Sequence, residues 1–231
     1  MMLMMVAHDL RSPLYQLTHL WRRAIQLADH KEYNKLTDTL HQGITMNQHT
    51  YQFMDNMLNW TMLQSNQLLF QKEHIHGNAL IDQVLHDFRM KITNKEIRIH
   101  KNIPKDIYIH GDLHSYKVIF QNFIDNALKY SFQKGTIRIV ASYISTMEYC
   151  KFTIRDYGEG MESDTVHKLL HTQERVQEHP EKKNSMGIGF QLCKQLLHKN
   201  GASITIESKK HIGTTIILTI PTLKSHNHVK N

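Results

Sequence analysis

Cysteine, proline and long apolar runs are scarce in this sequence, and each scarcity excludes a class of protein. The 231 residues include two cysteines and four prolines. Cys150 and Cys193 have no metal-binding spacing, and a chain of this length needs no disulfide to fold, so we expect two free, buried thiols in a reducing cytoplasm. The apolar start is interrupted by Asp9 and Arg11, well short of the roughly 20 residues of a membrane-spanning helix. We therefore expect no membrane segment in this chain.

Charge is plentiful but does not select one partner. Lys and Arg outnumber Asp and Glu by 28 to 21, and the formal net charge is +7. This balance suits nucleic acid, anionic lipid, ATP or an acidic protein surface. The basic residues are dispersed and have no aromatic stacking surface among them, which disfavours a nucleic-acid binder. The apolar content of 40% is enough for a core in each of one or two domains.

The first third of the chain has the periodicity of two helices. Apolar or small residues recur four and three apart, as in a heptad seam, at Leu3, Ala7, Leu10, Leu14, Leu17, Trp21, Ala24 and Ala28. After a polar break at 29–32, a second helical run passes through Leu36, Leu40, Ile44, Tyr51, Met54 and Leu58. The short connection predicts an antiparallel hairpin. Because two helices cannot enclose a core, we expect a homodimer in which two hairpins form a four-helix bundle.

From about residue 68 the pattern changes to short alternating strands separated by helices. The predicted strands are 97–100, 107–110, 136–143, 149–155, 203–207 and 214–220. The predicted helices are 77–92, 113–130 and 188–199. The fold class is therefore α+β, a helical hairpin followed by an α/β sandwich whose mixed sheet carries helices on one face. Residues 162–186 are polar and poorly periodic, so we expect a long functional loop there.

One of the 18 histidines has an unusual context. His8 opens the run His-Asp-Leu-Arg-Ser-Pro-Leu at the edge of the seam, where its ring should reach solvent. A neutral imidazole offers a nucleophilic nitrogen at neutral pH. Pro13 lacks a backbone donor and should kink or loosen the helix, at a cost of about 3 kcal/mol. A functional nucleophile is one interpretation, and a surface histidine beside a tolerated kink is the other.

A polar stripe runs along the predicted helix 113–130. Asn122 and Asn126 are four residues apart and project from one face, where Lys129 can join them. An amide oxygen suits magnesium, and a lysine supplies a point charge to phosphate. Helix caps and surface hydrogen bonds use the same residue types, so the stripe alone does not identify a site.

Glycines mark three further segments. Asp156 ends a strand, where its carboxylate can accept hydrogen bonds from an exocyclic amine, and the nearby Gly158 and Gly160 let the backbone approach a ligand closely. At 187–189 a Gly-Ile-Gly run opens a helix whose free amides favour phosphate. A Gly-Thr-Thr run at 213–215 precedes the last strand. Ordinary turns would explain each segment taken singly.

The order of these segments resembles the catalytic core of sensor histidine kinases. The matching segments are 8–14 for the H box, 122–131 for the N box, 156–160 for G1, 187–189 for G2 and 213–215 for a weaker G3. Five matches in one order over nearly the whole chain are improbable by coincidence. The resemblance implies a dimerisation and histidine phosphotransfer domain at 1–66, an ATP-binding domain of the DNA gyrase type at 67–224, and a polar tail at 225–231.

The resemblance also implies roles for single residues. His8 would attack the γ-phosphate of ATP, with Asp9 orienting or deprotonating its ring. Asn126 would hold Mg²⁺, and Asn122 occupies the place of the water-activating glutamate of gyrase-type ATPases, which fits transfer to histidine rather than hydrolysis. The remaining ATP-binding residues that it implies are Lys129 at phosphate, Tyr130 in the pocket, Asp156 at adenine, Gly158, Gly160, Gly187 and Gly189 around pocket and lid, and Thr214.

The implied function is ATP-dependent autophosphorylation of His8, followed by transfer to an aspartate of a response regulator receiver domain in two-component signalling. Because the heptads begin almost at the first residue, we expect the cytoplasmic core of a longer sensor, which a membrane segment elsewhere could anchor. Two other functions stay open: a non-catalytic dimeric signalling module of the same fold, and a gyrase-like ATPase.

The sequence also departs from the family pattern. Ser185 replaces the first glycine of G2, and residues 166–170 lack the aromatic F box. The resemblance therefore does not extend to the way in which the lid closes. Ser12 replaces the usual Thr or Asn credited with phosphatase activity.

Overall fold

The chain forms two compact units, residues 1–68 and 69–231, in a computed structural model that describes residues 2–64, 70–144, 148–171 and 186–222. Within those ranges no helix combines the length and the apolar character that a membrane span requires. Ser185 and the polar tail at 225–231 lie outside the described residues.

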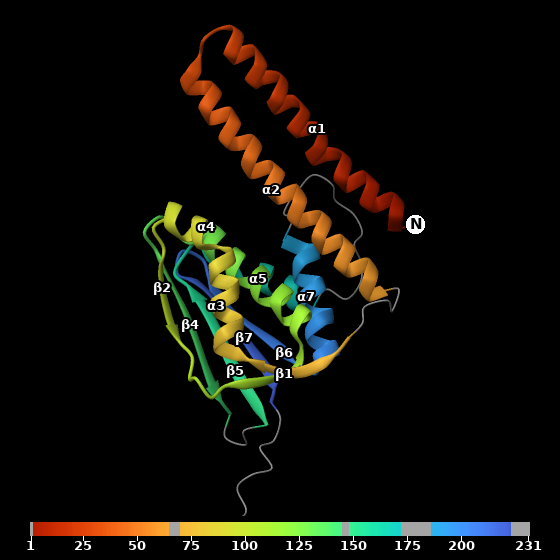
Figure 1. Ribbon diagram of the computed structural model, residues 1–231, viewed down its shortest axis with the longest axis vertical. Coiled ribbons are helices and arrows are strands. Elements are labelled where there is room, and N and C mark those ends of the chain that lie inside the picture. Colours follow the sequence, from red (N-terminus) through yellow and green to blue (C-terminus); the bar gives the residue numbers. More distant parts are fainter. Residues whose placement is uncertain (1, 65–69, 145–147, 172–185, 223–231) are drawn as a thin grey trace, which may run out of the picture. The chain divides into compact units, whose positions relative to one another are not determined.

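The first unit is an antiparallel helical hairpin, as predicted (Figure 1). Its helices are α1 (Met2–Asp29) and α2 (Tyr33–Gln64). The end of α1 is a Schellman motif, because the amide of Lys31 donates to Ala28 O over 3.0 Å and the amide of Glu32 donates to Leu27 O over 2.9 Å. Lys31 adopts a left-handed φ of 58° at the position that glycine usually occupies.

The two helices of the hairpin bury large and small residues against each other, on a stripe of α2 that differs from the predicted one. On α1, Leu17 and Ala24 are buried, whereas Leu14 and Trp21 of the predicted seam stay 51% and 42% exposed. On α2 the buried positions among the side chains that the structure describes are Thr39, Gly43, Thr50 and Met57. The predicted apolar run of α2 is one residue further along, and its members Leu40, Ile44 and Tyr51 are exposed. Close contact between the helices therefore uses one stripe of α2 and leaves the more apolar stripe beside it without cover.

The second unit is built on a five-stranded mixed sheet in the order β2-β4-β5-β7-β6. Its strands are β2 (Arg98–Asn102), β4 (Thr136–Tyr143), β5 (Tyr149–Asp156), β6 (Ser203–Lys209) and β7 (Gly213–Pro221). β2 pairs with β4 in parallel, and the other pairs are antiparallel. Burial alternates along β5, which is typical of a strand with one face on the core and one face in solvent.

A separate two-stranded sheet holds the predicted strand at 107–110. β3 (Tyr108–Asp112) pairs antiparallel with β1 (Lys72–His76) rather than joining the larger sheet. β1 was not predicted, because its sequence Lys-Glu-His-Ile-His has a single β-branched residue and three charged or exposed positions.

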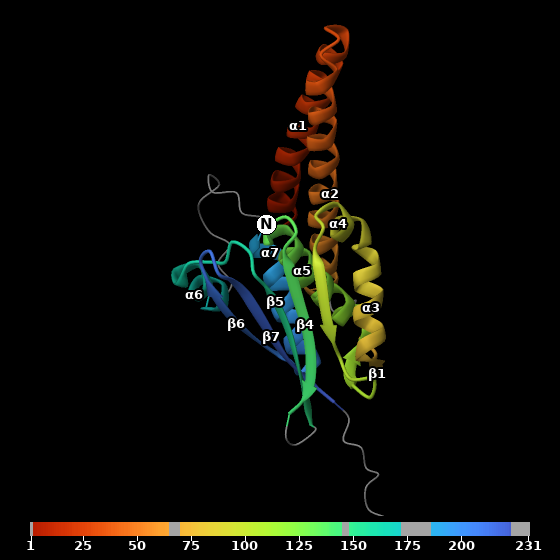
Figure 2. The ribbon, with the colours of Figure 1, turned by 90° about the vertical axis from the view of Figure 1, so that its left-hand side faces the viewer.

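Helices α3 (Gly77–Asp87), α5 (Leu113–Tyr130) and α7 (Met186–Asn200) cover one face of the five-stranded sheet (Figures 1 and 2). The single helix predicted at 77–92 is wrong, since a break at Phe88 separates α3 from α4 (Arg89–Asn94). The expectation of a loop at 162–186 is also corrected in its first half. There α6 (Ser163–His171) contacts β6, and its apolar residues Val166, Leu169 and Leu170 have the i, i+3, i+4 spacing of a helix face.

The core of this unit lies between the sheet and its helices. Fully buried side chains come from both layers and include Ile81, Tyr116, Phe120, Ile124, Ile137, Phe152, Ile154 and Leu192. The rings of Phe120 on α5 and Phe152 on β5 meet edge to face, with centroids 5.2 Å apart. At its start α5 is capped by Asp112, whose Oδ1 accepts from the amide of Ser115 over 2.7 Å. Packing and cap together fix α5 against β5, and the site described next lies between these two elements.

Candidate nucleotide site

A cavity of about 110 Å³ in the second unit brings together most of the predicted ATP-binding residues. Its apolar walls are Phe123, Ala127, Ile154, Met161, Leu169, Phe190, Ile206 and Ile216, and its other lining residues are Asn126, Tyr130, Asp156, Glu159, Gly160 and Thr214. Small-molecule sites usually measure about 300–1,000 Å³. The described residues therefore enclose the space for one ring system of a larger ligand.

Asp156 is the buried acid of the cavity. It ends β5 with 6% of its surface exposed, and its Oδ1 accepts hydrogen bonds from the amides of Gly158 over 3.0 Å and Thr214 over 3.3 Å. Burial raises the pKa of this carboxyl above its ordinary value, and the hydrogen bonds from Gly158 and Thr214 partly oppose that rise. Neither of these two amides donates to Oδ2, the second oxygen of the carboxylate.

Close backbone contacts explain the glycines around Asp156. A Cβ on Gly158 would collide with the carbonyl oxygen of Tyr130, at the end of α5. Gly160 has a φ of 63°, and a Cβ there would collide with the carbonyl of Lys209. Gly213, with a φ of 124°, approaches the carbonyl of Asp156 in the same way. Gly158 and Gly160 therefore let the loop after β5 dock on α5 and on the turn between β6 and β7.

The polar stripe of α5 forms another wall of the cavity. Asn126 and Tyr130 line it, one turn apart. Lys129 does not line the cavity, and its exposed ammonium lies 5.2 Å from the centroid of the Tyr130 ring. The structure thus brings the amide and the ring of the N box together with Asp156, and leaves the lysine at the rim.

Asn122 and Gly189 meet outside the cavity. A Cβ on Gly189 would stand 2.6 Å from Oδ1 of Asn122, so α7 comes against α5 at this point. Gly187 lies in the first turn of α7, and the structure describes only its backbone. Two of the predicted site residues therefore form a contact between helices rather than a wall of the cavity.

Several lining residues were not predicted. Phe123 and Phe190 pack edge to face with centroids 6.3 Å apart, and Leu169 comes from the segment that lacks an aromatic F box. Ile206 on β6 and Ile216 on β7 complete the apolar wall. Their only signal in the sequence is strand or helix periodicity, which marks them as core rather than as ligand contacts.

His8 and Asp9 lie on α1, in the other unit. The structure describes their backbone and not their side chains. The predicted disturbance at Pro13 does not interrupt α1, which is one continuous helix from Met2 to Asp29. Pro13 has no N–H, so the carbonyl of Asp9 lacks its usual helical donor four residues later. Ser12, the residue before Pro13, lies in the same helix, and the structure does not describe its side chain.

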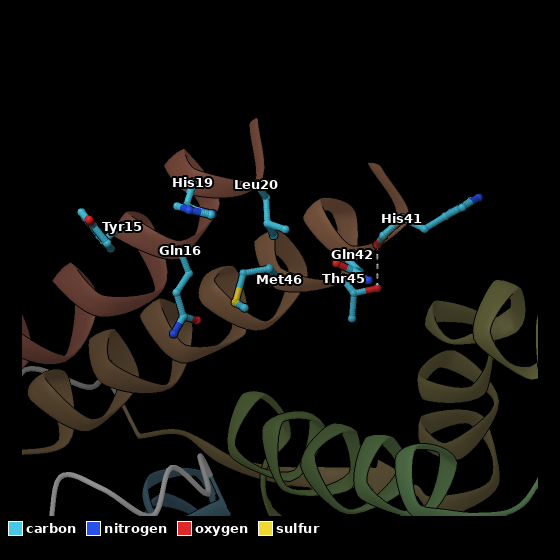
Figure 3. A pocket seen from close by; sticks show the side chains of 8 residues that line it. All are labelled: Tyr15, Gln16, His19, Leu20, His41, Gln42, Thr45 and Met46. Atoms are coloured by element: carbon cyan, nitrogen blue, oxygen red, sulfur yellow. Dashed lines mark hydrogen bonds between the residues drawn. The ribbon is translucent and has the colours of Figure 1, made fainter. Parts of the chain in front are cut away.

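An open groove of about 690 Å³ separates α1 from α2 on one side of the hairpin (Figure 3). Tyr15, Gln16, His19 and Leu20 line it from α1, and His41, Gln42, Thr45 and Met46 line it from α2. Thr45 Oγ1 donates to the carbonyl of His41 over 3.0 Å. Leu20 and Met46 are half-buried, so the hairpin alone leaves part of its apolar surface open. The groove holds none of the predicted catalytic residues.

Within the described ranges, no group of three or more His, Cys, Asp or Glu side chains forms a metal-binding cluster. The cavity offers the amide of Asn126 and the carboxylates of Asp156 and Glu159. Magnesium is commonly held by one or two protein groups, with the remaining ligands from water and substrate phosphates. The residues present are therefore compatible with Mg²⁺ that arrives with a nucleotide, and not with a cage made by the protein alone.

The known proteins that this chain resembles in sequence include ATPases and sensory kinases. Residues 111–224 match the family of histidine kinase-, DNA gyrase B- and HSP90-like ATPases. The adaptive-response sensory kinase SasA of Synechocystis sp. is 26% identical over 226 residues, which cover 95% of this chain and 58% of SasA. The heme sensor protein HssS of Staphylococcus saprophyticus is 29% identical over 147 residues, or 64% of this chain and 31% of HssS. The chain thus spans little more than half the length of SasA.

Solved structures share the fold. The Acinetobacter baumannii histidine kinase AdeS matches with a TM-score of 0.65 and 16% identity, over 93% of this chain and 98% of the AdeS chain. Histidine kinase ThkA, solved in complex with the response regulator protein TrrA, matches with a TM-score of 0.66 and 18% identity, over 98% of this chain and 62% of that chain. Both matches extend over the hairpin and the sandwich, so each unit has a counterpart in these structures.

Proposed function

The chain belongs to the sensor histidine kinases, whose ATPase domain it carries at residues 111–224, and we propose that it phosphorylates its own His8 with ATP and passes the phosphoryl group to an aspartate of a response regulator. The observation that carries the proposal is the buried Asp156 carboxylate, which two backbone amides hold in an apolar cavity beside the N-box helix. The assignment of residues 1–66 to dimerisation and phosphotransfer and of 67–224 to ATP binding is part of this proposal.

Adenine fits the cavity by shape and by hydrogen bonding. The apolar walls suit a flat ring, and Oδ2 of Asp156, which the amides of Gly158 and Thr214 do not use, can accept a hydrogen bond from an exocyclic amine. A carboxylate cannot donate, so it pairs with the N6 amine of adenine and opposes the O6 of guanine. Gly158 and Gly160 keep the loop close, Thr214 fixes Asp156 through its amide, and Tyr130 adds the ring on α5.

The phosphates would lie along the polar stripe of α5. Asn126 would supply an amide oxygen to Mg²⁺, and Lys129 would reach the phosphates from the rim. Bound ATP supplies the phosphoryl group, and Mg²⁺ offsets its charge. Gly187 and Gly189, in the first turn of α7, would offer free amides to the phosphates. Asn122 has an amide in place of a carboxylate base, which favours transfer to His8 over attack by water.

On the hairpin, a ring nitrogen of His8 would form the bond to the γ-phosphorus as ADP leaves. Asp9 would orient the imidazole and accept its ring proton. His8 is one helical position past the small seam residue Ala7, and Pro13 cannot donate to the carbonyl of Asp9 in the same helix.

A homodimer would bury the surface that one hairpin leaves open. Leu40, Ile44 and Tyr51 form an exposed stripe on α2, with 39%, 52% and 68% of their surfaces accessible. Trp21 and Ile25 add exposed apolar surface on α1. A stripe of this kind at heptad spacing is the usual contact of a four-helix bundle, and a second hairpin fits it by symmetry.

A response regulator is the proposed phosphoryl acceptor, in a cytoplasmic signalling pathway. ThkA, which shares this fold, was solved in complex with the response regulator protein TrrA. The receiver domain of such a partner supplies the aspartate, and the phosphoimidazole of His8 is the donor.

Incubation with ATP labelled at the γ-phosphate tests the proposal. We expect magnesium-dependent label on the protein that is stable in alkali and lost in acid, as a phosphoimidazole is. His8→Gln should abolish the label and keep ATP affinity, whereas Asn126→Ala should lose the magnesium-dependent part of ATP binding. Acid-labile label on His8→Gln would place the acceptor elsewhere, and release of phosphate without label would favour a gyrase-like ATPase.

A further inference from the structure

The carboxyl end of α5 is fully bonded, which is unusual because a helix leaves its last four carbonyls without partners in the helix. The carbonyl of Ala127 accepts from the amide and the hydroxyl of Ser131, over 3.0 and 2.7 Å. The carbonyls of Leu128 and Lys129 both accept from Nζ of Lys95, each over 2.8 Å. The carbonyl of Tyr130 accepts from the amide of Glu159 over 3.0 Å. One lysine side chain therefore satisfies half of this helix end.

Lys95 is held rigidly on its own side. It follows α4, where its amide donates to Lys91 O over 3.1 Å, and its carbonyl accepts from the amide of Lys134 over 3.0 Å. The ammonium group is partly buried, and this burial lowers the pKa of Lys95, while the nearby Glu159 carboxylate opposes the change. The lysine is thus a fixed cation between the end of α5 and the loop that follows β5.

Two walls of the cavity meet at this helix end. Asn126 and Tyr130 belong to the α5 wall, and Asp156 and Glu159 belong to the loop wall. The only backbone hydrogen bond that joins them among the described residues is the one from Glu159 N to Tyr130 O. The carbonyls that Lys95 binds immediately precede Tyr130, so a shift of the helix end would move Tyr130 away from the loop.

We propose that Lys95 is a positioning residue for nucleotide binding, which sets the spacing between the Asn126–Tyr130 wall and the Asp156 wall. This inference rests on the proposed ATP site. Lys95 does not line the cavity and acts through the carbonyls of Leu128 and Lys129. Loss of the ammonium would leave both carbonyls to water and free the last turn of α5 to fray.

The chain contains a matched control. Nζ of Lys91, one turn earlier, donates to Oδ1 of Asp125 on α5 over 2.7 Å. Lys91→Met therefore removes a charged tie between the same two helices without touching the helix end. Lys95→Met removes the cap, and Lys95→Arg keeps a cation with several donors.

The experiment measures three quantities on the full-length chain for the parent, Lys95→Met, Lys95→Arg and Lys91→Met. Isothermal titration gives the Kd for ATP with magnesium, thermal melting gives stability, and hydrogen exchange gives the protection of the Glu159 amide without nucleotide. We expect Lys95→Met to raise the Kd for ATP about tenfold or more, and each tenfold corresponds to about 1.4 kcal/mol of binding free energy. The Glu159 amide should also lose its protection from exchange. Lys95→Arg should keep most of the ATP affinity and most of the protection of the Glu159 amide. Lys91→Met should lower the melting temperature with the Kd within about twofold of the parent.

Three results would overturn the inference. Parental Kd and Glu159 protection in Lys95→Met would show that the helix end holds its place without the cap. Equal losses of affinity in Lys95→Met and Lys91→Met would assign both to general stability. A parent chain that binds no ATP would remove the proposed function and the inference together, whereas ATP binding that is unchanged in Lys95→Met removes the inference alone.

Discussion

The amide of Asn122 on α5 occupies the space in which a side chain on Gly189 of α7 would begin, with 2.6 Å between Asn122 Oδ1 and the position of that Cβ. Gly189 was predicted as a phosphate-binding glycine and Asn122 as a catalytic amide. Their contact gives each residue a packing role as well, so substitutions at either one will mix stability with activity.

Gly189→Ala should therefore destabilise the second unit by about 1–3 kcal/mol, because the new methyl group must displace the Asn122 amide. In an Asn122→Ala background the same substitution should cost less, since the obstructing amide is gone. Urea denaturation of the two single variants and the double variant gives the coupling energy. Additive losses would show that Gly189 and Asn122 are not in contact.

Asp156→Asn should be tolerated better as pH rises. Below pH 3.8, the ordinary pKa of the group, the carboxyl is protonated in the folded and the unfolded chain, and the substitution should change stability little. Burial raises the folded pKa, so above pH 3.8 the parent must either hold a proton or bury a charge, and its stability falls relative to the variant.

Urea denaturation of the parent and Asp156→Asn between pH 4 and pH 7 measures this difference. The amide oxygen of Asn can still accept from Gly158 and Thr214, so a folding defect is not expected. ATP affinity should fall in the same variant, because the charge-assisted bond to the base is lost. A variant that loses stability relative to the parent as pH rises would mean that a cation stabilises Asp156.

Lys31→Gly should stabilise the hairpin by about 1 kcal/mol, since Lys31 holds a left-handed φ of 58° in the Schellman motif that ends α1. Both tryptophans of the chain, Trp21 and Trp60, lie in this unit, so tryptophan fluorescence during urea denaturation reports its unfolding. Asp38→Gly, at an exposed position inside α2, is the control and should destabilise by about 1 kcal/mol. Equal effects of the two glycines would contradict the assignment.

Ile44→Glu should convert the proposed dimer to a monomer, because the substitution places a charge in the exposed apolar stripe of α2. Ile212→Glu is matched in exposure, at 49% against 52%, and lies in the turn between β6 and β7. Sedimentation of both variants at one protein concentration shows whether each is a monomer or a dimer, and we expect only Ile212→Glu to remain a dimer. Dimers in both variants would place the interface elsewhere, and a monomeric parent would exclude the dimer.

Local chemistry explains which parts of the fold the sequence predicts. The range predicted for α5 agrees with the structure because Asp112 caps its start and Ser131 adopts an extended conformation at its end. The strands β4 and β5 were predicted because apolar residues recur at every second position, and burial follows that alternation. α6 was missed because the polar residues around Val166, Leu169 and Leu170 hide a short apolar face.

The sequence predicted the part of the site that depends on the backbone conformation around Asp156. Asp156 and its glycines are recognisable because a strand end, a carboxylate and close backbone approach have a sequence pattern. The cap by Lys95 has no such pattern, since 33 residues separate it from Leu128. Phe190 and Ile216 look like ordinary core residues in the sequence, and only the fold shows that they line the cavity.

The hydrogen bond from Thr214 to Asp156 joins residues 58 positions apart, and β7, which carries Thr214, lies between β5 and β6. The last strand that the structure describes is therefore an interior strand of the sheet. During synthesis, β5 can pair with β4 but has no partner on its other side until β7 has left the ribosome. The Asp156 carboxylate therefore receives its hydrogen bond from Thr214 only when the second unit is complete, and we expect a nascent chain that ends before Gly213 to lack the proposed nucleotide site.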